Sequence, residues 1–366
     1  MSFRLLPKRK YDDVKAGNFI NPGKVQLAKN NRKDKPQSSP YLINQDLMDK
    51  ALEASNLKQQ YSPNLTIVEM APAAGVMSTS LYNYFKPKKH ILLESRDTFF
   101  DPLRKLSNQT GGRMQLIEKE GFKWSTYSEL IQSQILQATR QSEEEQAASP
   151  HQELLFAAHV PIHYYGLLFT SQIVEYLASR DWLGYYGRVR VLLWLPRSPA
   201  ITILTSQGFR NRSMTAVRRE AFIDTRVLVG NQSIHDGLMK RCPSKPKYSQ
   251  YLPKPIIQPP DELKFMEPLH DGHILVELTP KPFDNSLSLS LFTQVIKGLL
   301  YISRGKLKDS LELLGAGATN LIPAIRDAGV DVELPNFCLS AEDFKTITRI
   351  YERWPLRDPL KEDECV

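Results

Sequence analysis

Three glutamates recur in the first half of the sequence, each near the end of a short apolar run. Glu69 follows the run 65–68, Glu94 comes 25 residues later, and Glu120 follows the next run. A carboxylate at a strand end can hold ribose hydroxyls by accepting their hydrogen bonds, and another can face an adenine amino group. Each glutamate alone is more typical of a solvated carboxylate or a charge at a helix start. Their order and spacing together favour a nucleoside pocket.

The loop after Glu69 has the outline of a nucleotide-binding turn between a strand and a helix. It reads Ala71-Pro72-Ala73-Ala74-Gly75. Such turns normally use glycines, which let the backbone approach a ligand and tolerate positive φ. Ala71 and Ala73 keep the turn small but place methyl groups where a ligand would lie. The loop is therefore a working cofactor site, a retired one, or an ordinary buried strand end.

A second candidate site is the aromatic and basic sequence Phe122-Lys123-Trp124. Aromatic rings beside cations hold unpaired bases, at roughly 1–3 kcal/mol for each stacked base. The alternative is that both rings pack in the core or at its edge. Tyr164 and Tyr165 follow a histidine too closely to form a metal site, and we expect one of them to pack.

Two basic groups are candidates for contacts with phosphates, whose contribution to binding falls steeply with salt. The alternative is a solvated face with scattered ion pairs. The weaker group consists of Arg304, Lys306 and Lys308. The stronger group lies within 23 positions and consists of Arg197, Arg210, Arg212, Arg218 and Arg219.

Alternating elements position these residues. Short β-rich runs alternate with helical patterns, which predicts a parallel α/β sheet with right-handed crossovers. Ligand sites in such sheets gather at the carboxyl ends of the strands. The predicted strands are 65–70, 90–94, 113–117, 154–159 and 189–195. The predicted helices between them are 76–86, 96–107, 125–139, 166–179 and 198–206.

The second half of the chain changes character. Residues 141–152 read as a solvated loop, and 218–229 and 273–279 as strands. The proline-rich stretch 242–261 predicts an extended surface loop. A wholly helical pattern then marks a small second domain, with predicted helices at 287–303, 306–315, 318–328 and 341–353.

Composition bounds the class of protein. The 366 residues are 41% hydrophobic, enough for a large domain and a smaller one. The net charge of +8 suits a polyanionic partner. No apolar run is long enough to span a membrane, which predicts a soluble chain. The cysteines, Cys242, Cys338 and Cys365, lack metal-ligand spacing and read as reduced thiols.

The first 40 residues are basic and poor in acids. Such a segment is typical either of a mitochondrial targeting sequence or of a basic arm that adds affinity for nucleic acid. We expect four regions: a basic arm or targeting segment (1–45), a large α/β domain (46–283), a helical domain (284–354) and a flexible acidic tail (355–366).

Several segments resemble a known family. Residues 154–161 and 189–196 resemble the ribosomal RNA adenine dimethyltransferase superfamily. The sequences at 122–128, 181–183, 191–196 and 219–222 are similar to the fungal mitochondrial transcription factors derived from it. The resemblance covers roughly residues 60 to 355. It implies a Rossmann-like class I methyltransferase fold with a small C-terminal all-helical domain.

The resemblance also implies two losses. Active methylases of the superfamily carry Gly-Pro-Gly-x-Gly in the first loop, and here Ala71 and Ala73 replace the first two glycines. At the fourth strand they use Asn-Leu-Pro followed by an aromatic residue that stacks on the flipped base. His159 and Ile162 replace those two groups. A pocket of Glu69, Ala71, Ala73, Gly75, Glu94, Glu120 and His159 is thus expected to be vestigial. S-adenosylmethionine is not required, and its binding stays open.

The function implied by the resemblance is that of a mitochondrial transcription initiation factor, not an enzyme. Such a factor partners a single-subunit, phage-type RNA polymerase in the matrix, and as a monomer helps to melt the promoter. It holds the unpaired non-template strand, with residues 122–124 and the five arginines as candidate contacts. The alternatives are an active S-adenosylmethionine-dependent rRNA adenine N6-dimethyltransferase and a general nucleic-acid or ribosome-assembly module.

Overall fold

The structure is a computed structural model whose chain divides into two compact units. The sheet unit comprises Met1–Ala200, Thr225–His235 and Lys254–Pro280, and the helical unit comprises Ile201–Asp224, Asp236–Pro253 and Lys281–Val366. Most of the predicted basic arm, most of the acidic tail, Cys242 and Cys365 lie outside the described residues. The structure describes residues 41–42, 44–162, 164–240, 248–258, 265–266 and 272–357.

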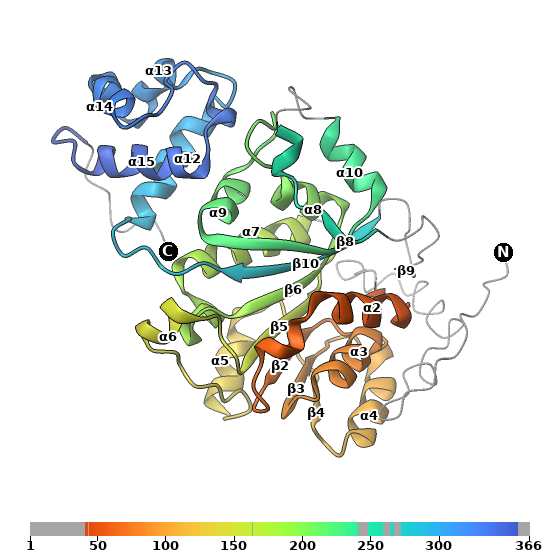
Figure 1. Cartoon of the computed structure of the whole chain (residues 1–366). Helices are drawn as coiled ribbons and strands as arrows, with labels where there is room; N and C mark the ends of the chain where they lie inside the picture. Colours follow the sequence, from red (N-terminus) through yellow and green to blue (C-terminus); the bar gives the residue numbers. More distant parts are fainter. Residues whose placement is uncertain are drawn as a thin grey trace. The chain divides into compact units, whose positions relative to one another are not determined.

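The sheet unit is built on eight strands in the order β4-β3-β2-β5-β6-β10-β7-β8 (Figure 1). From one edge they are β4 (Met114–Ile117), β3 (Lys89–Leu93), β2 (Thr66–Met70), β5 (Leu154–His159), β6 (Arg190–Pro196), β10 (His273–Pro280), β7 (Ile223–Val229) and β8 (Pro255–Ile257). A separate two-stranded ribbon pairs β1 (Tyr41–Leu42) with β9 (Phe265–Met266). The five predicted strands are present within about a residue of their expected bounds.

The sheet is mixed rather than wholly parallel, which corrects the prediction. β2 pairs in parallel with β3 and with β5, and β6 continues the parallel order. β10 is antiparallel to β6, with Leu275 opposite Trp194. An antiparallel strand on an otherwise parallel sheet is common in doubly wound folds. The carboxyl ends of β2, β3 and β5 still meet at one edge of the sheet.

Helices cover both faces of this sheet. On one face, α2 (Gln45–Ser55) and α3 (Val76–Phe85) pack with β2 and β5, for example through Met48, Leu81 and Leu155. On the other face, α5 (Trp124–Gln132) and the 3-10 turn η5 (Trp182–Tyr186) bring Tyr127 and Trp182 against Phe156 of β5. The remaining helices near the sheet are α4 (Phe100–Gln109), α7 (Tyr164–Ser179), α8 (Arg197–Leu204) and α10 (Gln232–Met239).

Two segments expected to be loops contain regular structure. Within 141–152 the chain forms α6 (Glu143–Ala148), because Ser142 and Glu145 make a reciprocal capping box that satisfies free amides of the first turn. Within 242–261 the chain forms β8, although it contains Pro255. A proline cannot donate to a sheet ladder, and β8 tolerates it because this strand lies at the sheet edge.

The helical unit has its own core. It contains α9 (Met214–Phe222), α12 (Leu289–Tyr301), α13 (Leu307–Ser310), α14 (Ile322–Asp327) and α15 (Ala341–Glu352). Val217 and Ala221, four residues apart on α9, pack in one cluster with Phe292 and Phe344. Residues 218–222 are thus helical, where we expected a strand. Because α9 shares this core, segment 201–224 groups with the C-terminal helices rather than with the sheet.

Within the part of the chain that the structure describes, no helix is both long and apolar enough to cross a membrane.

Candidate functional site

The loop after β2 keeps the backbone of a glycine-rich turn without its glycines. Ala71 has φ 55° and Ala73 has φ 52°, in the left-handed region that glycine occupies without cost. Gly75 has φ 76°, and a Cβ there would lie 3.1 Å from Leu106 Cδ2. Gly75 thus has little room for a side chain, and the two alanines hold a strained turn.

The carboxylate of Glu94 is occupied by the chain itself. Its Oε2 accepts from the backbone N–H of Ala73 at 3.1 Å and from Arg96 Nη2 at 2.7 Å. Its Oε1 accepts from Arg96 Nε at 2.8 Å and from the backbone N–H groups of Ser95 and Arg96. Glu94 is 2% exposed. This bidentate pair takes the acceptor positions that ribose hydroxyls would need.

Arg96 is a residue that the sequence analysis missed. Its guanidinium packs over the Phe99 ring, 4.6 Å from the centroid, while it pairs with Glu94. The cation two positions after the predicted ribose acceptor was a visible signal in the sequence. A cation there neutralises the carboxylate that a nucleoside site needs.

A small pocket remains beside this pair. Its empty space is about 230 Å³ including the open mouth. Glu120 lies at its wall and accepts from Ser95 Oγ and from the backbone N–H of Phe122, each at 3.2 Å. The lining residues are Ala71, Leu93, Glu94, Ser95, Arg96, Glu120 and Phe122.

Glu69 does not reach this pocket. Its side chain is fully buried in the sheet, and its Oε2 lies 2.9 Å from His90 Nε2 on the neighbouring strand β3. This pair lies inside the sheet unit. Of the residues predicted for the vestigial pocket, the structure gathers Ala71, Glu94 and Glu120 and places Glu69 in the core.

His159 belongs to the second altered motif and contacts the loop that carries the first, at Ala71. It ends β5, is 2% exposed, and hydrogen-bonds to the backbone of Ala71 in the altered loop. Burial lowers its pKa to about 3, and the positive charge of Arg96 adds to this shift. His159 is therefore neutral at physiological pH. The residue that replaces the base-binding asparagine of the methylases thus makes an internal contact.

The predicted aromatic and basic loop is partly a packing element. The Phe122 ring contacts Phe169 of α7 edge to face, with centroids 5.1 Å apart. The Trp124 ring meets Tyr176 at 4.8 Å and Trp182 at 5.0 Å, also edge to face. Edge-to-face pairs of this kind stabilise a fold. Lys123 between them is exposed.

Three of the five arginines are structural, which corrects the prediction that all five bind phosphates. Arg212 is 4%, Arg218 8% and Arg219 6% exposed, so their guanidinium groups lie inside the helical unit. Arg210 is exposed in the same unit, and Arg197 belongs to the sheet unit, where its Nη1 lies 3.4 Å from Ser233 Oγ.

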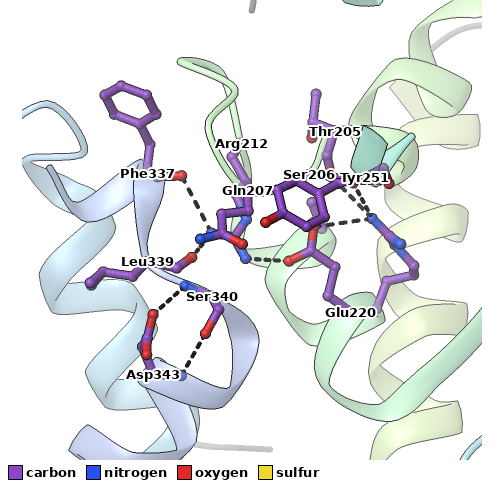
Figure 2. A network of polar contacts seen from close by, with 12 residues as sticks. Thr205, Ser206, Gln207, Arg212, Glu220, Tyr251, Phe337, Leu339, Ser340 and Asp343 are labelled. Atoms are coloured by element: carbon purple, nitrogen blue, oxygen red, sulfur yellow. Dashed lines mark hydrogen bonds and ion pairs between the residues drawn. The ribbon is translucent and has the colours of Figure 1, made fainter. Parts of the chain in front are cut away.

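Arg212 and Arg219 belong to one polar network (Figure 2), whereas Arg218 donates to Thr293 Oγ1 at 3.0 Å. Arg212 Nη1 donates to the carbonyl of Leu339 and, at 3.4 Å, to that of Phe337, while Nη2 pairs with Glu220. Arg219 donates to the carbonyls of Ile203 at 3.0 Å and of Thr205 at 3.1 Å. Burial lowers the pKa of Arg219, and the charge of Glu220 opposes this shift. The network ties segment 203–220 to segment 337–339.

The weaker basic group is also partly paired. Lys306 and Lys308 both contact Glu333, at 3.0 and 2.9 Å, whereas Arg304 is exposed. Cys338 is buried and is not part of a disulfide among the described residues. Among the described residues, no cluster of three or more histidine, cysteine or acidic side chains is arranged to hold a metal ion.

The chain is similar in sequence to known proteins over most of its length. The protein named mitochondrial transcription factor 1 from Saccharomyces cerevisiae is 26% identical over 337 residues, covering 88% of this chain and 91% of the relative. The one from Lachancea kluyveri is 24% identical over 332 residues with the same coverage. Among solved structures, M. jannaschii TYW2 in complex with AdoMet matches 64% of this chain and 76% of its own, at 9% identity and a TM-score of 0.29.

The family model described as ribosomal RNA adenine dimethylase matches residues 29–352, which is most of the chain. The mixed eight-stranded sheet with helices on both faces is the fold that this family and class I methyltransferases share, so the predicted fold class is confirmed. The chain belongs to the ribosomal RNA adenine dimethylase family.

Proposed function

We propose that this protein is a non-catalytic transcription initiation factor of mitochondria. It acts as a monomer in the matrix, partners a single-subunit, phage-type RNA polymerase, helps to melt promoter DNA and holds the unpaired non-template strand. The names of the relatives that match 88% of the chain support this role. S-adenosylmethionine is not required for it.

The main support for the proposal is that the carboxylate of Glu94 is already bound by groups of the chain itself. In a cofactor-dependent methylase this carboxylate has to be available to the ribose of the cofactor. Here Arg96 binds both of its oxygens, and the amide of Ala73 binds one of them. His159 in turn contacts the backbone of Ala71. Both halves of the former reaction site are thus filled by internal contacts, which supports a role based on binding alone.

The alternative function is an active rRNA adenine N6-dimethyltransferase. One observation favours it: Ala71 and Ala73 keep the left-handed φ of the glycines that they replace, so the turn retains its shape. Tritiated methyl transfer to ribosomal RNA distinguishes the two functions, because the initiation factor transfers no label. A general nucleic-acid module would bind nucleic acid but would not bring down a polymerase on purification.

Reconstituted transcription tests the proposal directly. Purified mitochondrial RNA polymerase from the same source is expected to initiate on a linear duplex promoter only when this protein is added. On a template whose start region is already unpaired, the dependence is expected to be much smaller, since melting is no longer needed. Run-off transcripts measure both. Equal activity with and without the protein on the duplex promoter would overturn the proposal.

A cofactor titration tests the occupied pocket. S-adenosylmethionine at about 1 mM is expected to leave the melting temperature unchanged, since a ligand stabilises only when its concentration approaches its Kd. Arg96→Ala frees both oxygens of Glu94 from the guanidinium. In this variant the melting temperature is expected to rise with S-adenosylmethionine concentration and to reach a plateau. A shift of the wild-type protein at micromolar cofactor would contradict this assignment.

A further inference from the structure

Two neighbouring tyrosines at the start of α7 are strongly exposed. Tyr164 is 68% and Tyr165 58% exposed, and Leu168, one turn later, is 39% exposed. The two tyrosine rings lie edge to face with centroids 6.2 Å apart. We had expected one of them to pack in the core, and the structure corrects that. Large aromatic rings left in water next to each other are typical of a binding surface.

The position of this pair connects it to the former reaction site. α7 follows β5, whose last residue is His159. Phe169 lies four residues after Tyr165, on the same face of the helix. It is buried, and the Phe122 ring packs against it. Phe122 also lines the small pocket of Arg96. The tyrosines therefore lie at the end of α7 that follows the carboxyl end of β5, and the loop of Phe122 packs against the same helix.

The chemistry of this surface fits an unpaired nucleic-acid strand. Every base has a π face that can stack on an exposed aromatic ring, and the phenolic hydroxyl can stay in water. Lys123 is exposed and follows Phe122, whose ring packs against Phe169 of the same helix, so the loop that packs on α7 offers a cation for the phosphate backbone.

Trp124 is a weaker candidate for stacking than these tyrosines. Its ring is held between Tyr176 and Trp182 and is also near Tyr127, 6.2 Å away. Trp124 is only partly exposed, whereas Tyr164 and Tyr165 expose more than half of their surface.

We propose that Tyr164 and Tyr165 form the platform on which bases of the unpaired DNA strand stack, with Lys123 contacting the adjacent phosphates. The inference rests on the proposed function and names the residues that perform it. It assigns the aromatic role to α7, whereas Trp124 packs against Tyr176 and Trp182. The bound ligand is single-stranded DNA, recognised by the faces of its bases and by its charge.

Fluorescence anisotropy with a labelled single-stranded oligonucleotide, a pre-melted promoter and a duplex of the same sequence tests the platform. The variant with Tyr164→Ala and Tyr165→Ala is expected to bind single-stranded and pre-melted DNA roughly 5- to 150-fold more weakly, the loss of one stacked base. Duplex binding is expected to change less than about twofold. Replacing both tyrosines by phenylalanine, which keeps the π faces, is expected to restore most of the affinity.

Two matched variants complete the design. Tyr301→Ala removes a tyrosine of the helical unit that is 83% exposed, more than either Tyr164 or Tyr165, and is expected to leave all three affinities unchanged. Lys123→Ala is expected to reduce the slope of log affinity against log salt by about 0.7 for a single strand, whereas the double tyrosine variant keeps the wild-type slope.

The outcomes separate the inference from the proposed function. If the wild-type protein does not prefer unpaired DNA over duplex, the proposed function fails. If the preference is present but the double alanine variant behaves like Tyr301→Ala, the platform is overturned and the function stands. Loss of polymerase binding by the double variant, with unchanged DNA affinity, would also overturn the platform and assign the tyrosines to a protein partner.

Discussion

Arg212→Ala is expected to lower the free energy of unfolding by about 3 kcal/mol. The guanidinium is buried, and its removal leaves the carbonyl groups of Leu339 and Phe337 without this donor and takes one of two arginine partners from Glu220. Breaking a buried ion pair from one side typically costs 3–5 kcal/mol. Arg219 remains within 3.3 Å of Glu220, so we expect the lower end of that range. Urea unfolding followed by circular dichroism measures the change.

Arg210→Ala is the matched control, two positions away in the same unit. Arg210 is exposed, so its removal is expected to change the free energy of unfolding by less than about 0.5 kcal/mol. If Arg210 contacts DNA, its loss lowers the affinity and reduces the salt slope by about 1 on duplex DNA. Equal stability of the two variants would show that the network around Arg212 is not formed. A lower salt slope for both, at unchanged stability, would restore the predicted phosphate-binding group.

The sequence predicted the sheet well because its signals are local. Strand β5 has the predicted bounds 154–159, and its residues are all buried, as an unbroken apolar run in a parallel sheet implies. The capping box at Ser142 and Glu145 was equally local, and the polar composition of 141–152 hid the short helix. Local patterns thus specify the elements, provided that caps are weighed along with polarity.

The burial of the arginines could not be predicted in the same way. Arg212 is buried because it bonds to Leu339, which lies 127 residues later in the chain. No local pattern around Arg212 predicts a partner that far along the chain. A run of arginines has the same sequence whether it faces solvent or the core. The pair of Glu94 with Arg96 was different, since both residues lie in one short segment. Long-range pairing decides which charges are available for a ligand.

The pair of Ala71 and His159 shows how the two sequence departures depend on each other. Ala71 takes a left-handed backbone and offers its peptide group to the His159 ring. An alanine at positive φ typically costs about 1 kcal/mol or more relative to glycine. The contact with His159 helps to hold this turn. The loop after β2 and the end of β5 therefore form one structural unit.

This structural unit should make the protein sensitive to acid, and His159→Asn should reduce that sensitivity. Burial, assisted by the charge of Arg96, lowers the pKa of His159 to about 3. Burial likewise lowers the pKa of neighbouring His273 to about 4. An unfolded histidine titrates near 6.5, so the unfolded chain binds more protons between these values. The stability contributed by neutral His159 is complete above about pH 6.5 and is lost as the pH falls toward 3.

The expected size of the effect follows from the shift. Between pH 7.5 and pH 4.5, the burial of neutral His159 is expected to lower the protein's free energy of unfolding by roughly 2–3 kcal/mol. His159→Asn removes this decrease because asparagine does not titrate. Urea unfolding across this range is expected to give a shallower pH dependence for His159→Asn than for the wild type. His235→Asn, at an exposed position on α10, is expected to leave the dependence unchanged. Parallel curves for all three proteins would mean that His159 is solvated and that the contact with Ala71 does not hold the turn.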